Sequence, residues 1–542
     1  MSEKKIKVVK DCIGVCFIVS ALYFLVRAFL LTFSVDIWYD ELFSMEFAKR
    51  SFSELISLTS RDVHPPLYYI IVRIFLLMGN GMGVPLETIA KSVSIVPFLL
   101  MFIYGVTFVR KNFGLLSCGI FCFAIVTMPG LPEYTTEIRM YSWAMFFVTA
   151  FLIHALNLMR NYLNGTGKWD LVNGAAIYLY GTAAFYTHYY AALSVGIIYS
   201  YVFIWMIVVY VKVMRDKVKG KKPLNLKMLS TLIISANLSA VSYIPWLSVL
   251  FGQVNTVSSN YWIQPVGIRT FGSCIKYLFS GYFTNSLITV IIAVILFALS
   301  AFTAVSNIYR LIKRQYEDEI QKIRDFQSLI AIAVLPMLAI VGIIASILIR
   351  PVFVNRYMIP ALGAFYLAVS IEIGRTFAVK KVSRPIQIAF CIFGLLIAIV
   401  GITDFNAFIG NEEYRIVNME KTAEFFDELD SDTLIISNFN QVQALLAYYL
   451  NNDETEDEHK IYLYYGEPEV LVDDMLSGLY TIEDSVDVKN YLLSGKRVLF
   501  LGSFNSREVI LNEWNEDYGI TYENLGSFLM ERYWFDVFEL SL

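Results

Sequence analysis

The sequence predicts a polytopic α-helical membrane protein with about 11 transmembrane helices and a C-terminal soluble α/β domain. Three observations predict it: the apolar composition, a series of apolar runs of transmembrane length, and an acidic final quarter. Of the 542 residues, 57% are hydrophobic and 17% are charged. Soluble domains average about 45–50% and 25%, and a soluble fold cannot bury this much apolar surface. The composition excludes disordered, collagen-like and nucleic-acid-binding classes.

Eleven apolar runs are long enough to cross a bilayer, which takes about 17–25 residues. The predicted spans are 12–34, 85–109, 113–130, 138–160, 171–188, 190–213, 228–250, 283–309, 327–350, 356–376 and 385–405. A shorter run at 66–80 contains Arg73. We expect it to form a helix lying at the membrane interface, where Arg73 reaches the lipid headgroups.

The distribution of Lys and Arg predicts the orientation in the plasma membrane. Four lysines within the first ten residues keep the N-terminus in the cytoplasm. With eleven spans, 24 Lys and Arg fall inside and 9 outside. If 66–80 also crossed, the richest basic segment, DKVKGKKPLNLK (216–227), would face outward. The odd count places the C-terminal domain outside the cytoplasm.

A change in charge near residue 405 predicts two domains. Residues 406–542 carry 28 acidic and 8 basic residues, whereas the preceding part carries 19 and 35. We therefore expect a membrane domain at 1–405 and an acidic extracytoplasmic domain at 406–542. The second domain is expected to be α/β with a partly parallel sheet. Its predicted strands are 433–438, 460–465 and 497–503, and its predicted helices are 419–429 and 440–452.

Polar residues gather in the predicted outer loops, of which the first, at 35–84, is the longest. Ionisable residues at the membrane edge are costly unless they are paired or hydrated, so they indicate function. Such residues in the outer loops include Asp40, Glu41, Asp62, His64, Glu137, Arg139, His188, Arg350 and Arg356. Carboxylates provide a general base, Arg and His bind phosphate, and aromatic rings bind a sugar or belong to the headgroup belt. This combination fits a lipid phosphate that carries a sugar.

Five motifs carry a resemblance to a known family. They are WYDE (38–41), DVHPPLYY (62–69), EIRMY (137–141), THYY (187–190) and NRYMIP (355–360). In this order they resemble bacterial membrane glycosyltransferases of the GT-C superfamily, a group that includes protein mannosyltransferases and aminoarabinose transferases. The resemblance covers roughly residues 10–400. It implies a GT-C-like fold, a polyprenyl-phosphate sugar donor, inverting transfer on the outer face, and an acidic catalytic residue in the first outer loop.

The resemblance also implies roles for individual residues. Asp40 would be the general base, and Glu41 would hold Asp40 or the acceptor. The residues expected to bind the donor's phosphate or sugar are Arg356, Tyr357, Arg139, Glu137, Tyr141, His188, Asp62 and His64. No cofactor is expected. A divalent cation at Asp40 and Glu41 is possible, but the sequence does not require one, and no metal-binding spacing is present.

Several alternatives remain open. Asp40 and Glu41 suit the cap of a following helix, because acidic residues favour helix N-termini. Tyr189 and Tyr190 suit the aromatic belt, and His154, inside a span, suits packing. A lipid-linked sugar flippase is the alternative function, although transporters usually place their polar sites near the midplane. The acceptor is a glycan, a lipid or a protein.

Overall fold

The computed structural model describes residues 3–163, 167–215, 224–256, 263–281, 287–313, 319–376, 384–451 and 458–542. Most of the basic segment 216–227 and of an acidic segment at 453–459 lies outside them. The chain forms two compact units. The helical unit comprises Met1–Thr32, Val63–Gly79 and Ile89–Ile409. The α/β unit comprises Phe33–Asp62, Asn80–Thr88 and Gly410–Leu542.

Nine helical segments of the described residues are long and apolar enough to cross a membrane, so the chain is a multi-pass membrane protein. Their elements are α1 (Glu3–Leu31), the series α5 (Leu86–Val93), α6 (Val96–Tyr104), η1 (Gly105–Val109) and α7 (Arg110–Phe113), α9 (Tyr141–Leu163), α11 (Tyr189–Arg215), α12 (Leu226–Thr256), α14 (Leu287–Lys313), α15 (Glu319–Leu348), η3 (Asn355–Met358) with α16 (Ile359–Thr376), and α17 (Arg384–Asp427).

Every predicted span contains a helix, but three helices differ in length from the prediction. The predicted spans at 113–130 and 171–188 form α8 (Leu115–Thr127) and α10 (Leu171–Phe185), with only 13 and 15 residues. The last span continues to Asp427, because no proline interrupts the polar sequence after residue 405. The helix predicted at 419–429 is therefore the end of α17. The short helix predicted at 66–80 is α4 (Leu67–Gly79).

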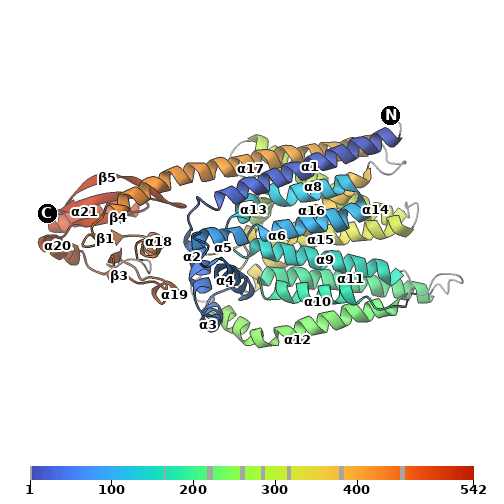
Figure 1. The fold of residues 1–542 in the computed structure, drawn as a ribbon, viewed down its shortest axis with the longest axis horizontal. Coiled ribbons are helices and arrows are strands. Elements are labelled where there is room, and N and C mark those ends of the chain that lie inside the picture. The colour runs from blue at the N-terminus through green and yellow to red at the C-terminus, as the bar shows by residue number, and fades with distance from the viewer. Residues whose placement is uncertain are drawn as a thin grey trace. The chain divides into compact units, whose positions relative to one another are not determined.

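Two helices form the centre of the helical unit. α9 packs against α10, α11 and α16, and α16 packs against α8 and α15; these helices run side by side in Figure 1. In α9, 89% of the most apolar stretch of 18 residues is buried, and in the segment that contains α16 the whole of this stretch is buried. In α12 and in α14, only 22% of the corresponding stretch is buried. Helices that are apolar all round therefore divide into a central pair and an outer set whose free faces suit lipid.

Three of the five motifs lie at the starts of long helices, whereas Lys or Arg residues lie at the ends of these helices. α9, α11, α14 and α16 all carry Lys or Arg in the last turn. The segments that contain EIRMY, THYY and NRYMIP instead precede or begin α9, α11 and α16. Motifs that are far apart in the sequence therefore lie together at one end of the helical unit.

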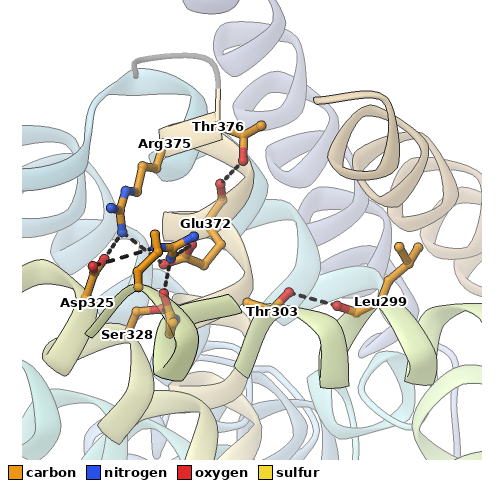
Figure 2. A network of polar contacts seen from close by, with 9 residues as sticks. Leu299, Thr303, Asp325, Ser328, Glu372, Arg375 and Thr376 are labelled. Carbon is orange, nitrogen blue, oxygen red and sulfur yellow. Dashed lines mark hydrogen bonds and ion pairs between the residues drawn. The ribbon is translucent and has the colours of Figure 1, made fainter. Parts of the chain in front are cut away.

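A buried group of charges ties together the basic ends of α14, α15 and α16 (Figure 2). Arg310 of α14 donates to Glu372 of α16 (2.9 Å) and pairs with Asp325 of α15 (3.6 Å). Arg375 of α16 also pairs with Asp325. Both carboxylates are at most 1% exposed. Each is accompanied by arginine, as a buried charge requires.

The α/β unit contains a six-stranded sheet of order β3-β2-β1-β4-β6-β5. The first four of these strands are parallel, whereas β6 runs antiparallel to both β4 and β5. The strands are β1 (Leu434–Ser437), β2 (Ile461–Tyr464), β3 (Leu479–Ile482), β4 (Val498–Gly502), β5 (Thr521–Met530) and β6 (Tyr533–Ser541). A core that includes Phe500 and Trp514 joins the sheet to α20 (Ser485–Leu493) and α21 (Ser506–Tyr518).

The partly parallel sheet and three of its strands, β1, β2 and β4, agree with the sequence-based prediction. The helix predicted at 440–452 is α18 (Asn440–Leu450). The prediction missed β3 and the hairpin of β5 and β6. The remaining elements are α2 (Tyr39–Lys49), α3 (Phe52–Arg61), η2 (Pro132–Thr135), α13 (Ile268–Phe279) and α19 (Val470–Asp473).

Candidate functional site

The ten predicted site residues are divided between the two units. The helical unit contains seven of them: His64, Glu137, Arg139, Tyr141, His188, Arg356 and Tyr357. The α/β unit contains the other three: Asp40, Glu41 and Asp62. The predicted base therefore belongs to the α/β unit, and most of the predicted donor-binding groups belong to the helical unit.

Local structure places the seven residues of the helical unit at helix ends. His188 lies in the turn between α10 and α11, and Arg356 and Tyr357 lie in η3, between α15 and α16. The prolines of DVHPPLYY precede α4, where a proline costs no helical hydrogen bond. The backbone N–H of Leu67 donates to the carbonyl oxygen of Tyr186 (2.9 Å), which joins this segment to the turn that holds His188.

His188 is the centre of a buried aromatic cluster. Its ring centroid lies 5.4 Å from that of Tyr141, 5.7 Å from that of His64 and 5.1 Å from that of Tyr357. The guanidinium carbon of Arg356 lies 5.9 Å from the ring centroid of Tyr141, near the limit for a cation–π contact. Four motifs that are distant in sequence therefore meet at one point.

The surroundings of His188 keep its ring neutral. Burial, followed by the nearby His64, Arg139 and Arg356, lowers the pKa of His188 well below its ordinary value. The backbone N–H of Tyr190 donates to Nδ1 of His188 (3.1 Å). In the neutral ring Nδ1 is then the acceptor, and the proton is on Nε2. His188 can thus donate one hydrogen bond from Nε2 to an anion.

Glu137 and Arg139 lie in the tight segment that leads into α9. The hydroxyl of Ser94 donates to the carbonyl oxygen of Glu137 (2.6 Å), and the backbone N–H of Arg139 donates to the same oxygen (2.7 Å). Both side chains are buried, each 6% exposed. The backbone therefore holds Arg139 in a fixed place, close enough to His188 to lower its pKa.

A cavity of about 300 Å³ adjoins the cluster. Its polar lining residues are His64, His188, Tyr189, Tyr190, Gln253, Arg350 and Tyr357. Apolar walls come from helices α11, α12 and α15, including Leu193, Leu250 and Ala345. One part of the cavity is therefore polar and cationic, and the rest is lined by apolar side chains.

Some of these lining residues were left open or missed by the sequence analysis. The hydroxyl of Tyr190 donates to the carbonyl oxygen of Val352 (3.0 Å), and its ring centroid lies 4.7 Å from that of Tyr357. Tyr190 therefore belongs to the cavity rather than to a lipid-facing belt. Gln253 accepts a hydrogen bond from the hydroxyl of Tyr189. Gln253 follows the predicted span 228–250 by three positions, and a polar residue at this predicted outer edge was the signal that could have identified it.

A second cavity, of about 390 Å³, also reaches η3. It is lined by Gly130, Glu133, Ser273, Lys276, Tyr277, Gly281 and Asn355. The amide of Asn355 donates to the hydroxyl of Ser273 (2.5 Å). Carboxylate, ammonium, amide and hydroxyl groups together can bind a ligand that has many hydroxyls.

In the α/β unit, WYDE begins α2. The carboxylate of Glu41 accepts a hydrogen bond from the backbone N–H of Trp38 (3.0 Å) and is 1% exposed. Glu41 thus caps its own helix, the structural role that the sequence left open. Asp40 is half-buried. Asp62 ends α3, where its backbone N–H donates to the carbonyl oxygen of Leu58 (3.2 Å).

Two further sequence-based expectations concern histidine and metal. Within α9, His154 has hydrogen bonds at both ring nitrogens, to Tyr104 (2.8 Å) and Asn173 (2.7 Å), as expected for a satisfied packing residue. Among the described residues, no group of three or more His, Cys, Asp or Glu side chains is placed to hold a metal ion. That the protein requires no metal stays a prediction.

The site and fold define a multi-pass helical membrane protein with a cationic, aromatic cluster at the helix ends and a C-terminal α/β domain. No family model matches the sequence, and no curated protein matches it. The chain is similar to the solved structure of ArnT from Cupriavidus metallidurans bound to undecaprenyl phosphate. The identity is 14% over 97% of this chain and 98% of that chain, with a TM-score of 0.49. For the apo state of the same ArnT, the identity is 12% over 97% of this chain and 97% of that chain, with a TM-score of 0.48.

Another similar structure is the archaeal oligosaccharyltransferase AglB from Archaeoglobus fulgidus, in complex with an inhibitory peptide and a dolichol-phosphate. The identity is 13% over 72% of this chain and 55% of that chain, with a TM-score of 0.35.

Proposed function

We propose that the protein is an inverting glycosyltransferase that moves a sugar from a polyprenyl-phosphate donor to an acceptor hydroxyl on the outer face of the membrane. The observation that carries the proposal is the cavity beside His188. Its polar portion suits a phosphate, and its apolar walls from three helices suit an isoprenoid chain. A volume of about 300 Å³ is at the small end for ligand pockets, so it fits the phosphate end of the donor with the rest of the chain in lipid.

The cationic groups are suited to the leaving phosphate. Arg139 and Arg356 both lie near enough to His188 to lower the pKa of its ring, and Arg350 lines the cavity itself. The neutral His188 adds a hydrogen-bond donor at Nε2. Fixed donors in a water-poor site stabilise charge that develops as a bond breaks. We assign Arg139, Arg356 and His188 to the phosphate, and His64, Tyr141 and Tyr357 to its immediate surroundings.

The proposed reaction is one displacement at the anomeric carbon. The acceptor oxygen forms a bond to this carbon as the carbon–oxygen bond to the phosphate breaks, and the polyprenyl phosphate leaves with the electron pair. Asp40 takes the acceptor's proton, a step that typically contributes about 10²–10⁴-fold. Glu41 holds the first turn of α2. The second cavity, which has a carboxylate and an amide, is assigned to sugar hydroxyls, together with Glu137 and Asp62.

A lipid-linked sugar flippase would use the same donor without breaking a bond. Transporter sites usually lie near the bilayer midplane on broken helices. Here the polar cluster lies where α10 ends and where α9, α11 and α16 begin. This placement favours chemistry at one membrane face over transport.

The test uses purified protein in nanodiscs with a panel of polyprenyl-phosphate sugars and an extract of cell-envelope acceptors. Mass spectrometry follows the release of free polyprenyl phosphate. We expect release by the wild type and a loss of about 10²–10⁴-fold in Asp40→Asn. Asp517→Asn, which removes an exposed carboxylate of α21, is the control and should retain full activity.

Two outcomes contradict the proposal. If the wild type and Asp40→Asn release polyprenyl phosphate equally fast, Asp40 is not the base. Movement of intact donor between leaflets of proteoliposomes, without release of polyprenyl phosphate, identifies a flippase.

A further inference from the structure

Residues Phe33–Asp62 of the first loop and the C-terminal residues Gly410–Leu542 belong to one compact unit, and three consecutive residues show how they are joined. Ile37, Trp38 and Tyr39 directly precede Asp40. The backbone N–H of Ile37 donates to the hydroxyl of Tyr449, on α18 (2.8 Å). Each of the next two residues also contacts a different C-terminal element.

Trp38 and Tyr39 are held by charged side chains. The guanidinium carbon of Arg532, between β5 and β6, lies 3.9 Å from the ring centroid of Trp38, a close cation–π contact. The hydroxyl of Tyr39 donates to Oε2 of Glu469, which precedes α19 (2.8 Å). Burial, followed by the charge of Glu469 and this hydrogen bond, raises the pKa of Tyr39 far above its ordinary value. Tyr39 therefore stays protonated and remains a donor.

Further contacts fix the rest of the loop on the same elements. Arg50, which ends α2, donates to the carbonyl oxygen of Met475 (2.8 Å). Arg61 of α3 pairs with Asp474 (2.7 Å), although both side chains are nearly half exposed and the pair is worth little by itself. The hydrogen bonds beside Asp40 involve a buried tyrosine and a backbone amide, so they constrain the loop more strongly.

From these contacts we infer that Glu469 of the C-terminal region is a positioning residue for Asp40, acting through the hydroxyl of Tyr39. The inference rests on the proposed function, in which Asp40 is the base. Tyr39 and Asp40 are the first two residues of α2, so a bond that fixes one orients the other. A misplacement of about 1 Å in a reacting group can cost about 10²-fold in rate. The acidic C-terminal region thus has a task in catalysis without contacting the substrate.

The test compares Glu469→Leu, Glu469→Gln, Tyr39→Phe and the double variant Tyr39→Phe/Glu469→Leu. Glu469 is exposed, so its replacement removes little packing. We expect kcat to fall about 10- to 100-fold in Glu469→Leu and Tyr39→Phe, with the KM for the donor unchanged. Glu469→Gln should retain most of the activity, because its amide oxygen still accepts from Tyr39. The double variant should be no worse than either single variant.

The control is Glu483→Leu, which removes another exposed carboxylate of the same unit and should change nothing. Amide hydrogen exchange of residues 39–49 supplies a readout that needs no activity. We expect faster exchange in Glu469→Leu and Tyr39→Phe, and no change in Glu469→Gln or Glu483→Leu.

The outcomes separate the two claims. If the wild type consumes no donor but α2 exchanges faster in Glu469→Leu, the proposed function fails and the anchoring of the loop stands. If exchange of α2 is unchanged in both Glu469→Leu and Tyr39→Phe, the inference is wrong whatever the activity. Additive losses in the double variant, or a change in KM alone, also overturn it.

Discussion

His188 shows how one residue acquires its chemistry from its neighbours. Its ring is 2% exposed, it accepts a backbone hydrogen bond at Nδ1, and cationic groups surround it. An isolated histidine would be half protonated near pH 6.5. In the folded protein burial, followed by the nearby His64, Arg139 and Arg356, lowers the pKa of His188 well below that value.

This difference predicts a pH dependence of stability. The pKa of His188 is lowered in the folded state, so below about pH 6.5 the unfolded chain binds a proton that the folded chain does not. Stability therefore falls as the pH drops through this range. We expect the thermal midpoint in detergent to fall less steeply between pH 7 and pH 5 in His188→Gln than in wild type. Equal slopes for the two proteins would contradict the assignment.

The sequence identified the types of residue in the site better than their exact roles. Outer-loop position and ionisable chemistry singled out His188, Arg139 and Arg356, and the structure groups them. The same reasoning paired Glu41 with Asp40, because adjacent carboxylates look alike in a sequence. Only coordinates show that Glu41 bonds to the backbone N–H of Trp38. Contacts to residues hundreds of positions away, such as that of Tyr39 with Glu469, leave no local pattern.

At the scale of elements, α1 and α8 approach through glycine. A methyl group added at Gly119 of α8 would overlap the carbonyl oxygen of Gly14 of α1. Small residues at such crossings allow close packing of membrane helices. The shortness of α8 makes this contact more important, because 13 residues provide little other surface.

We therefore expect Gly119→Ala to destabilise the protein by about 1–3 kcal/mol through overpacking. Thermal unfolding in detergent measures the change. Gly196→Ala is the matched control: Gly196 lies in α11, and no atom lies within 4 Å of an added methyl group. It should be neutral or stabilise by up to about 1 kcal/mol, because alanine is the better helix former. Equal effects of the two substitutions would contradict the packing argument.

Apolar runs predicted helices well because length and composition are sufficient to identify a span. They predicted helix ends less well. α17 continues 22 residues beyond the predicted boundary at 405, since helix formation does not stop where the lipid does. The missed strands β5 and β6 have a different cause. β5 is largely exposed and reads as a polar segment, and its partner β6 becomes apparent only when the two are paired.

At the scale of the whole molecule, charge predicts orientation. Lys and Arg occur in the last turns of α9, α11, α14 and α16, so we expect these ends to face the cytoplasm. We expect alkaline phosphatase fused after Leu542 to be active and a fluorescent protein fused there to be dark. Fusions after Arg215 should give the reverse. An active phosphatase after Arg215 would show that the orientation is inverted.

The buried charges of α14, α15 and α16 have a consequence for how this part of the protein becomes stable. Asp325 and Glu372 are each paired with an arginine on another helix, Arg375 and Arg310. An unpaired buried carboxylate near a helix end is costly, although less so than the about 2.5–3.5 kcal/mol of a central position. The last of these three helices to be synthesised, α16, supplies both a carboxylate and an arginine. These charges are paired only when all three helices are together, so we expect this part of the protein to become stable as a group.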